Sequence, residues 1–303
     1  MKKFIIKILK FISIFIGLMI FFNFIVFPNN KNAFTYKYEL LQNTDVEVIV
    51  TGNSHLGFGV VADNLSFNSI NIANKARLLE TDIDILLSID LEKRKNLKAI
   101  LLPVSYYSLF NKFNTVSKNH IDQKRLYYNY YKLKQYSQNL YKNSLVLNEP
   151  FKELFEDSFL LNYMKKSPFS KKGWRANDNV FLRDKEILKK VSNLNVNSLN
   201  RENVDYNLRK LEELLIKCKE LGVRVFLILP PYSSYYYEIS KNEFNNFIKQ
   251  ELNTFRKYNN ISILESNNFM PTSLEFYENS DHLNKKGALV YTKKLDSILK
   301  IRL

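Results

Sequence analysis

The sequence predicts an α/β fold, in which a central parallel sheet is covered by helices on both faces. Apolar runs of strand length, such as "VEVIVTG" and "VRVFLILPP", are nearly continuous rather than alternating, which is typical of parallel strands buried on both faces. Segments with helical spacing separate these runs, as the βα alternation of such folds requires. A charge-free run near the amino end predicts, in addition, one transmembrane helix.

The elements follow one another in a regular order. After a stem over residues 29–45, the expected strands are "VEVIVTG", "SINIA", "LKAILLPV", "VRVFLILPP" and "ISILES". The expected helices are "RLLETDIDILLSIDLEKRK", "NVDYNLRKLEELLIKCKELG" ended by Gly222, "KNEFNNFIKQELNTFRKY" and the terminal "NKKGALVYTKKLDSILKI". Ligands of a doubly wound sheet sit outside the carboxyl ends of its strands, so we expect the functional site in the loops that follow the strands.

The first 28 residues predict a retained signal anchor. Four lysines precede or begin the apolar run, and no charged residue occurs from Phe11 to Phe27, a length that can cross a bilayer. Lysines before the span favour a cytoplasmic amino end and a translocated domain, which makes the chain a single-pass protein of the cell membrane. A cleaved signal peptide shares this layout, but no small-x-small cleavage site follows the run.

The chain is basic, with a formal net charge of +15, and subtracting the four amino-terminal lysines leaves +11. A domain outside the membrane seldom meets nucleic acid, so anionic lipid head groups or wall polymers are the expected acidic surroundings. The single Cys218 excludes an intrachain disulfide and any multi-cysteine metal site. The three histidines are too scattered to form a metal motif, and we expect neither a metal nor a cofactor.

Residues 105–200 interrupt the alternation within the domain of residues 46–303. They are rich in Tyr, Lys and Asn, and we interpret them as a largely helical insertion between the third and fourth strands. The tyrosines could stack on sugars, because an aromatic face with a polar tip suits carbohydrate, or they could pack the insertion onto the sheet. Trp174 is the candidate for a substrate-facing aromatic in this region.

Two polar clusters follow the first and last expected strands. "GNSH" carries Ser54 directly after the first strand, and "DHLNKKGA" carries His282 after the last. Because both loops lie at the carboxyl edge of the sheet, we expect the two side chains to meet. A histidine within hydrogen-bond reach activates a serine nucleophile, and a third polar group orients the imidazole. The alternative is an ordinary turn, since Gly, Asn and Ser are common turn residues.

These clusters resemble a known family. "TGNSHLGFG" resembles the first block of the SGNH/GDSL hydrolases, and "DHLNKKGA" resembles their last block. The "HLN..GA" form is similar to membrane-anchored SGNH-like proteins of bacterial surface-polymer modification, such as the alginate acetylation proteins and the D-alanine transfer protein. The resemblance spans roughly residues 46–298 with a poorly matched middle. It implies a flavodoxin-like, three-layer α/β/α fold.

Carried over by position, the resemblance implies Ser54 as nucleophile and His282 as base. Asn279 stands where the family usually has the aspartate of the triad, and it can orient a histidine without stabilising the imidazolium by charge. Asp281 and Glu278 are alternatives nearby. Asn53 replaces the aspartate of the first block.

The groups that would stabilise an oxyanion are left open by the sequence. The backbone amide of Ser54, together with Asn74 or Ser105, could supply them, because the family's usual glycine and asparagine are not evident. His55 is expected to be structural or to contact substrate rather than to act as the base.

The resemblance implies an O-acyltransferase or esterase acting on acyl esters of a surface glycan, with acetyl as the expected acyl group. A membrane-bound O-acyltransferase is a potential partner, and nucleic acid is not. The alternative from another class is a catalytically impaired glycan-binding or assembly factor, because Asn279 replaces aspartate. A secreted lipase or general esterase is a second rival.

Overall fold

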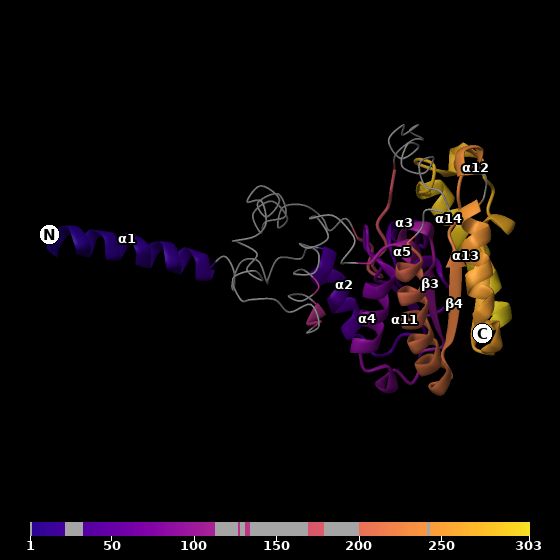
Figure 1. The fold of residues 1–303 in the computed structure, drawn as a ribbon, viewed down its shortest axis with the longest axis horizontal. Helices are drawn as coiled ribbons and strands as arrows, with labels where there is room; N and C mark the ends of the chain where they lie inside the picture. Colours follow the sequence, from indigo (N-terminus) through magenta and orange to yellow (C-terminus); the bar gives the residue numbers. More distant parts are fainter. Residues whose placement is uncertain are drawn as a thin grey trace. The chain divides into compact units, whose positions relative to one another are not determined.

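The computed structural model describes residues 2–21, 33–112, 127, 131–133, 169–178, 200–240 and 243–303 (Figure 1). The chain divides into two compact units, Met1–Tyr38 with Ser117–Ser167 and Glu39–Val116 with Pro168–Leu303. Most of the expected insertion at residues 105–200 lies outside the described residues. The second unit contains the sheet and the candidate site.

The first unit carries the apolar amino-terminal helix α1 (Lys2–Phe21). Its segment Lys3–Phe21 has a mean hydropathy of 2.4 and is unburied, so it is long and apolar enough to cross a membrane. A signal sequence near an amino terminus has the same length and composition. Helix α2 (Ala33–Gln42) begins in this unit, where the expected stem lies.

The second unit is built on five parallel strands in the order β2-β1-β3-β4-β5. In the centre, Val50 of β1 pairs with Asn71 on one side and Leu101 on the other. This is the order of flavodoxin-like doubly wound sheets, so the predicted α/β class is confirmed. The strands are β1 (Val48–Val50), β2 (Ser69–Asn71), β3 (Ala99–Pro103), β4 (Arg224–Leu229) and β5 (Ile261–Glu265).

Helices cover the sheet on both faces. Helix α11 packs against α4, α5 and β4, whereas α14 packs against α3, and Figure 1 shows α4, α5 and α11 in front of the strands. The helices are α3 (Ser54–Gly59), α4 (Leu79–Ser88), α5 (Tyr106–Phe110), α11 (Arg201–Glu220), α12 (Ser234–Ser240), α13 (Glu243–Asn253) and α14 (Lys285–Arg302). Short 3₁₀ turns are η2 (Ala62–Asn64), η3 (Leu91–Lys93), η7 (Thr254–Lys257), η8 (Ser266–Asn268) and η9 (Leu274–Phe276).

The core is formed by alternate strand positions and the apolar stripes of the helices. Val48 and Val50 of β1 are fully buried with Leu56 of α3 and with Leu295 and Leu299 of α14. These side chains pack α3 and α14 onto one face of the sheet, and apolar burial of this kind stabilises a fold by roughly 25 cal/mol per Å². The start of α3 is therefore held at the carboxyl edge of β1.

Two helix boundaries and one side chain test the sequence interpretation. Gly222 has φ +70° just after α11, which confirms it as the residue that ends this helix. Helix α4 ends at Ser88, earlier than the helical spacing predicts, because Asp90 accepts a hydrogen bond from the Lys93 amide and starts the separate turn η3. Cys218 is buried, and burial raises the pKa of its thiol to about 12.

Candidate active site

A buried charge cluster holds the loop that follows β1. One carboxylate oxygen of Asp82 accepts hydrogen bonds from the Thr51 hydroxyl at 2.7 Å and the Gly52 amide at 2.9 Å. The same oxygen lies 3.2 Å from the guanidinium of Arg77, which is completely buried. Gly52 has φ +114°, and a Cβ atom there would overlap the ring of Pro103, so this turn requires glycine. The peptide leading into α3 is therefore fixed.

Ser54 is the first residue of α3 and contacts a histidine far along the chain. Asn53 caps the helix by accepting a hydrogen bond from the His55 amide at 3.1 Å. The Oγ atom of Ser54 lies 2.7 Å from Nε2 of His282, which is 228 residues away in sequence. The Glu278 amide donates to the His282 carbonyl at 2.9 Å, which closes the loop around the histidine. The predicted meeting of serine and histidine thus occurs as a hydrogen bond.

The other ring nitrogen of His282 has two neighbours with different roles. Oδ1 of Asn279 lies 3.1 Å from Nδ1 and also accepts from the backbone amides of Asp281 and His282. Oδ1 of Asp281 is also 3.1 Å from Nδ1, at ion-pair distance but without a hydrogen bond. Asn279 therefore orients the ring, with the proton on Nδ1 and the lone pair of Nε2 facing Ser54. Asp281 supplies a negative charge.

His55 forms the second half of a buried array around Asp281. Its Nδ1 lies 2.9 Å from Oδ1 of Asn53, and its Nε2 lies 3.5 Å from Oδ2 of Asp281. The rings of His55 and His282 are stacked at 5.2 Å between centroids and 16° between planes. The Tyr106 hydroxyl donates to Oδ2 of Asp281 at 3.4 Å. The carboxylate is thus approached by two imidazoles and one phenol.

Burial and charge shift the pKa values of Asp281, His282 and His55 in different directions. Burial alone would raise the pKa of Asp281, but His282 and His55 hold it well below its usual range. Burial would lower the pKa of His282, but the charge of Asp281 outweighs it and raises that pKa. Burial lowers the pKa of His55 despite Asp281. The first proton taken up at this site therefore belongs to His282.

His55, Asp281 and His282 also place three potential ligand atoms within 4.8 Å of one another. A metal would have to lie in the planes of both rings, and stacked rings have nearly parallel planes whose lone pairs do not converge. Both Nδ1 atoms already face asparagine oxygens. This geometry fits a hydrogen-bonded array better than a metal centre.

Asn74 and Ser105, the candidate oxyanion groups, differ in availability. The backbone amide of Asn74 donates to the Gly52 carbonyl at 2.9 Å, which ties the loop after β2 to the loop that carries Ser54. Among the described residues, Nδ2 of Asn74 is buried without a hydrogen-bond partner. Ser105 is completely buried, where it caps α5 and its Oγ accepts from Asn53 at 3.3 Å and from the Ser108 amide. Asn74 therefore has a donor to offer, whereas Ser105 has its hydroxyl engaged.

Trp174 is connected to His282 through Phe58 and has no described contact with the histidine itself. Its indole N–H donates to the Phe58 carbonyl in α3 at 2.7 Å. Phe58 in turn meets the His282 ring edge-on at 5.9 Å. The indole nitrogen of Trp174 is thus engaged in supporting α3, and its expected contact with substrate stays a prediction.

Sequence inspection did not identify the supports of this site. Arg77 and Asp82 lie in the stretch "RLLETDID", where an acid inside an apolar helix is an available but weak signal. Tyr232 packs edge-on against His55 at 5.7 Å and stacks on Tyr236 at 4.1 Å. Nothing in the tyrosine-rich sequence distinguishes these two from the other tyrosines.

Comparison with solved structures gives distant likenesses. No family model matches the sequence, and no curated protein matches it. Among solved structures, a candidate platelet activating factor from Streptococcus pneumonia has a TM-score of 0.43 at 10% identity, covering 95% of this chain and 99% of that one. A candidate acylhydrolase from Bacteroides fragilis has a TM-score of 0.43 at 9% identity, covering 89% and 95%. Neither likeness assigns a reaction to this chain.

Proposed function

We propose that this protein is a membrane-anchored, extracytoplasmic serine acyltransferase or esterase of the SGNH type, acting on acyl esters of a cell-surface polysaccharide. One observation carries the proposal: Ser54 Oγ lies 2.7 Å from His282 Nε2 while Nδ1 faces Asn279 and Asp281. A hydroxyl, an imidazole and an orienting group in this order form the arrangement that activates serine for attack on an acyl carbon.

The proposed reaction has two steps, acylation of Ser54 and transfer of the acyl group to an acceptor. Ser54 Oγ attacks the acyl carbon as its proton passes to Nε2 of His282, and the proton then moves to the departing alcohol oxygen, which leaves the acyl group on the serine. In the second step a sugar hydroxyl or water attacks the acyl-enzyme and gives its proton to His282. Collapse of the second tetrahedral intermediate returns a proton to Ser54. Transfer and hydrolysis differ only in the acceptor.

The replacement of the usual aspartate by Asn279 does not remove charge from the site. Asn279 supplies the hydrogen bond that fixes the tautomer, and Asp281 supplies the negative charge near the imidazolium that forms during attack. The Tyr106 hydroxyl donates a hydrogen bond to the carboxylate and helps to hold it in place. This division of roles supports an active enzyme over an impaired binding factor.

Asn74 is the proposed oxyanion donor. Its Nδ2 is buried without a partner among the described residues, and a buried amide that lacks an acceptor is costly to fold unless a ligand completes it. Together with the Ser54 amide, it would stabilise negative charge on the acyl oxygen. Ser105 is set aside, because its hydroxyl already serves the α5 cap.

The amino-terminal helix and the charge of the chain support the proposed location. Helix α1 can cross a membrane by its length and composition, and the remaining chain is basic, which suits an anionic surface outside the cell. A polysaccharide substrate, acetyl as the acyl group and a membrane-bound O-acyltransferase as partner rest on the resemblance of the two serine and histidine blocks.

The test is covalent labelling of the full chain in lipid nanodiscs with a fluorophosphonate probe. We expect label on Ser54, no label in Ser54→Ala, and at least a roughly hundredfold slower reaction in His282→Ala. A folded protein that takes no label would overturn the enzyme in favour of a glycan-binding or assembly role. Cleavage of surface-polymer acetyl esters, with no activity on triglycerides, would separate the proposal from a general lipase.

A further inference from the structure

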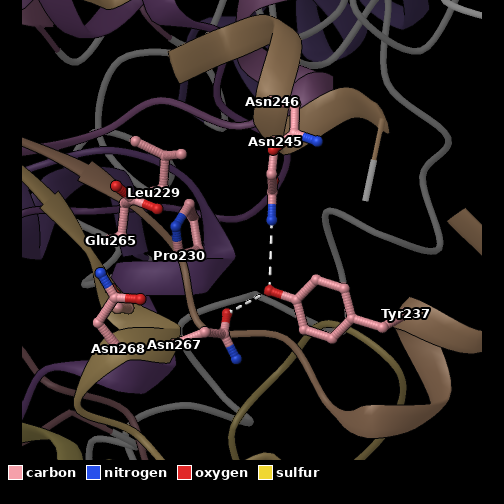
Figure 2. A pocket seen from close by; sticks show the side chains of 9 residues that line it. Leu229, Pro230, Tyr237, Asn245, Asn246, Glu265, Asn267 and Asn268 are labelled. Carbon is pink, nitrogen blue, oxygen red and sulfur yellow. Dashed lines mark hydrogen bonds between the residues drawn. The ribbon is translucent and has the colours of Figure 1, made fainter. Parts of the chain in front are cut away.

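A hollow lies at the carboxyl ends of β4 and β5 and has a volume of about 290 Å³ (Figure 2). Its walls come from the ends of these strands, from α12 and α13, and from η8. Small-molecule pockets range over roughly 300–1,000 Å³, so this hollow is sized for one ring rather than for an extended chain. Its position follows the rule that ligands of parallel sheets bind at this edge.

The lining is rich in amides, with four asparagines beside Leu229 and Pro230. Figure 2 shows the Tyr237 hydroxyl between Asn245 and Asn267; it donates to Oδ1 of Asn267 at 2.7 Å and accepts from Nδ2 of Asn245 at 3.3 Å. Asn246 and Asn268 are exposed on opposite walls, with no side-chain hydrogen bond to any described residue. Each free amide offers two donors and an acceptor, so the hollow presents paired hydrogen-bonding groups on two sides.

The chemistry of the lining selects among ligand classes. An apolar ligand would leave the amides and the phenol without partners. An anion would be repelled by Glu265, and a cation would compete with Lys249, whose ammonium already lies 2.6 Å from that carboxylate. A sugar ring carries hydroxyls that both donate and accept, which matches amides and a carboxylate together. We propose that this hollow binds one neutral sugar ring of the polymer, a subsite assignment that rests on the proposed function.

The hollow is linked to the serine and histidine site through Asn267 and Tyr232. Asn267 holds both backbone groups of Tyr232, accepting from its amide at 3.0 Å and donating to its carbonyl at 2.8 Å. The Tyr232 ring meets His55 edge-on at 5.7 Å. A sugar in the hollow therefore lies against the segment that also packs on the catalytic array, on the β4 and β5 side of the sheet edge. This location replaces Trp174 as the main candidate for saccharide contact.

Saturation-transfer NMR on the full chain in lipid nanodiscs tests the subsite, with methyl β-glucoside, methyl β-galactoside and N-acetylglucosamine as probes. We expect at least one of them to bind, and the double variant Asn246→Ala/Asn268→Ala to bind it about tenfold or more weakly, because two hydrogen bonds are lost. The matched control is Asn259→Ala, an exposed asparagine at the opposite end of β5, which should bind as the wild type does.

A second measurement detects contact with the sugar directly. In wild-type protein labelled with ¹⁵N at asparagine, the sugar should shift side-chain amide resonances that the double variant lacks. Equal binding by wild type and double variant, or no binding of any of the three sugars, would overturn the subsite. Fluorophosphonate labelling of Ser54 is measured separately. Labelling without sugar binding would overturn the subsite and keep the proposed enzyme. Sugar binding without labelling would keep the subsite and overturn the enzyme.

Discussion

Asp281 and His282 are neighbours in the chain and also face each other, with Oδ1 of the carboxylate 3.1 Å from Nδ1 of the imidazole. That nitrogen instead donates its hydrogen bond to Oδ1 of Asn279. In the usual serine triad one aspartate both orients the histidine and stabilises the imidazolium by its negative charge. Here Asn279 orients the ring and Asp281 supplies the charge, so each role can be removed by a separate substitution.

Asp281→Asn should lower kcat by about two orders of magnitude or more, because the imidazolium loses its countercharge. Asp281 raises the pKa of His282 against the effect of burial. The acidic limb of the pH profile should therefore lie above pH ~6.5, the ordinary histidine value, and move to lower pH in the variant. Hydrolysis of 4-nitrophenyl acetate between pH 5 and 9 measures both effects.

Asn279→Ala is the matched comparison, because it removes orientation and keeps charge. Its kcat should fall while the acidic limb stays in place, and Asn279→Asp should retain activity. An unmoved limb in Asp281→Asn, or the same shift in both variants, would contradict the division of roles.

His55→Gln should flatten the pH dependence of stability below neutrality. The pKa of His55 is lowered in the folded protein by burial, so between its folded value and about 6.5 the unfolded chain binds more protons, and stability falls as pH falls. His282 acts with the opposite sign: its raised pKa gives stability that is complete below about 6.5 and is lost as pH rises through its folded pKa. Melting temperatures from pH 5 to 8 separate the two, and a His55→Gln profile parallel to the wild type would refute the first.

Asp82→Asn should destabilise the protein by roughly 3–5 kcal/mol, because it removes the carboxylate charge that lies beside the buried guanidinium of Arg77. Burial raises the pKa of Asp82, and Arg77, Thr51 and Gly52 each oppose that rise. Asp90→Asn is the control, since Asp90 pairs with Lys93 at the surface, and its melting temperature should barely change. Similar losses in the two variants would show that the buried cluster is not the support of the loop.

Gly52→Ala and Gly222→Ala separate backbone strain from steric overlap. Both glycines have positive φ, but a Cβ at Gly222 meets nothing within 4 Å, whereas one at Gly52 meets Pro103. Gly222→Ala should cost about 1 kcal/mol, and Gly52→Ala should cost several times more and abolish labelling of Ser54. Thermal unfolding and fluorophosphonate labelling give the two readouts, and equal costs would argue against the overlap.

Asn74→Ala should lower kcat by roughly 10²–10³-fold with little change in KM, because an oxyanion donor acts mainly in the transition state. Asn64→Ala, at an exposed asparagine in η2, is the control and should leave both constants unchanged. Steady-state kinetics with 4-nitrophenyl acetate distinguish the outcomes. A raised KM with an unaltered kcat would assign Asn74 to ground-state binding.

The sequence was sufficient to predict the class of fold and the contact between Ser54 and His282. Parallel strands bring the loops at their carboxyl ends to one edge whatever the intervening chain contains. Tertiary detail decided the rest. The direction of Asp281 depends on the turn that Asn279 forms with the amides of residues 281 and 282, and adjacent positions in a loop carry no periodic signal.

Other candidates depended on local competition that a sequence does not resolve. A serine after a strand suits either an oxyanion site or a helix cap, and in "SYYS" the capping box with Ser108 prevailed at Ser105. Trp174 donates to a backbone carbonyl, which any residue provides. The extra length predicted for α4 arose because Leu91 continues its apolar spacing past the true end.

The separation of 228 residues between serine and histidine has a consequence for the life of the chain. A growing polypeptide carries a chemically ordinary alcohol at position 54 until the last strand and its following loop have been made and folded. Under the proposed function, copies that lack this loop have no base for Ser54 and leave nearby esters intact.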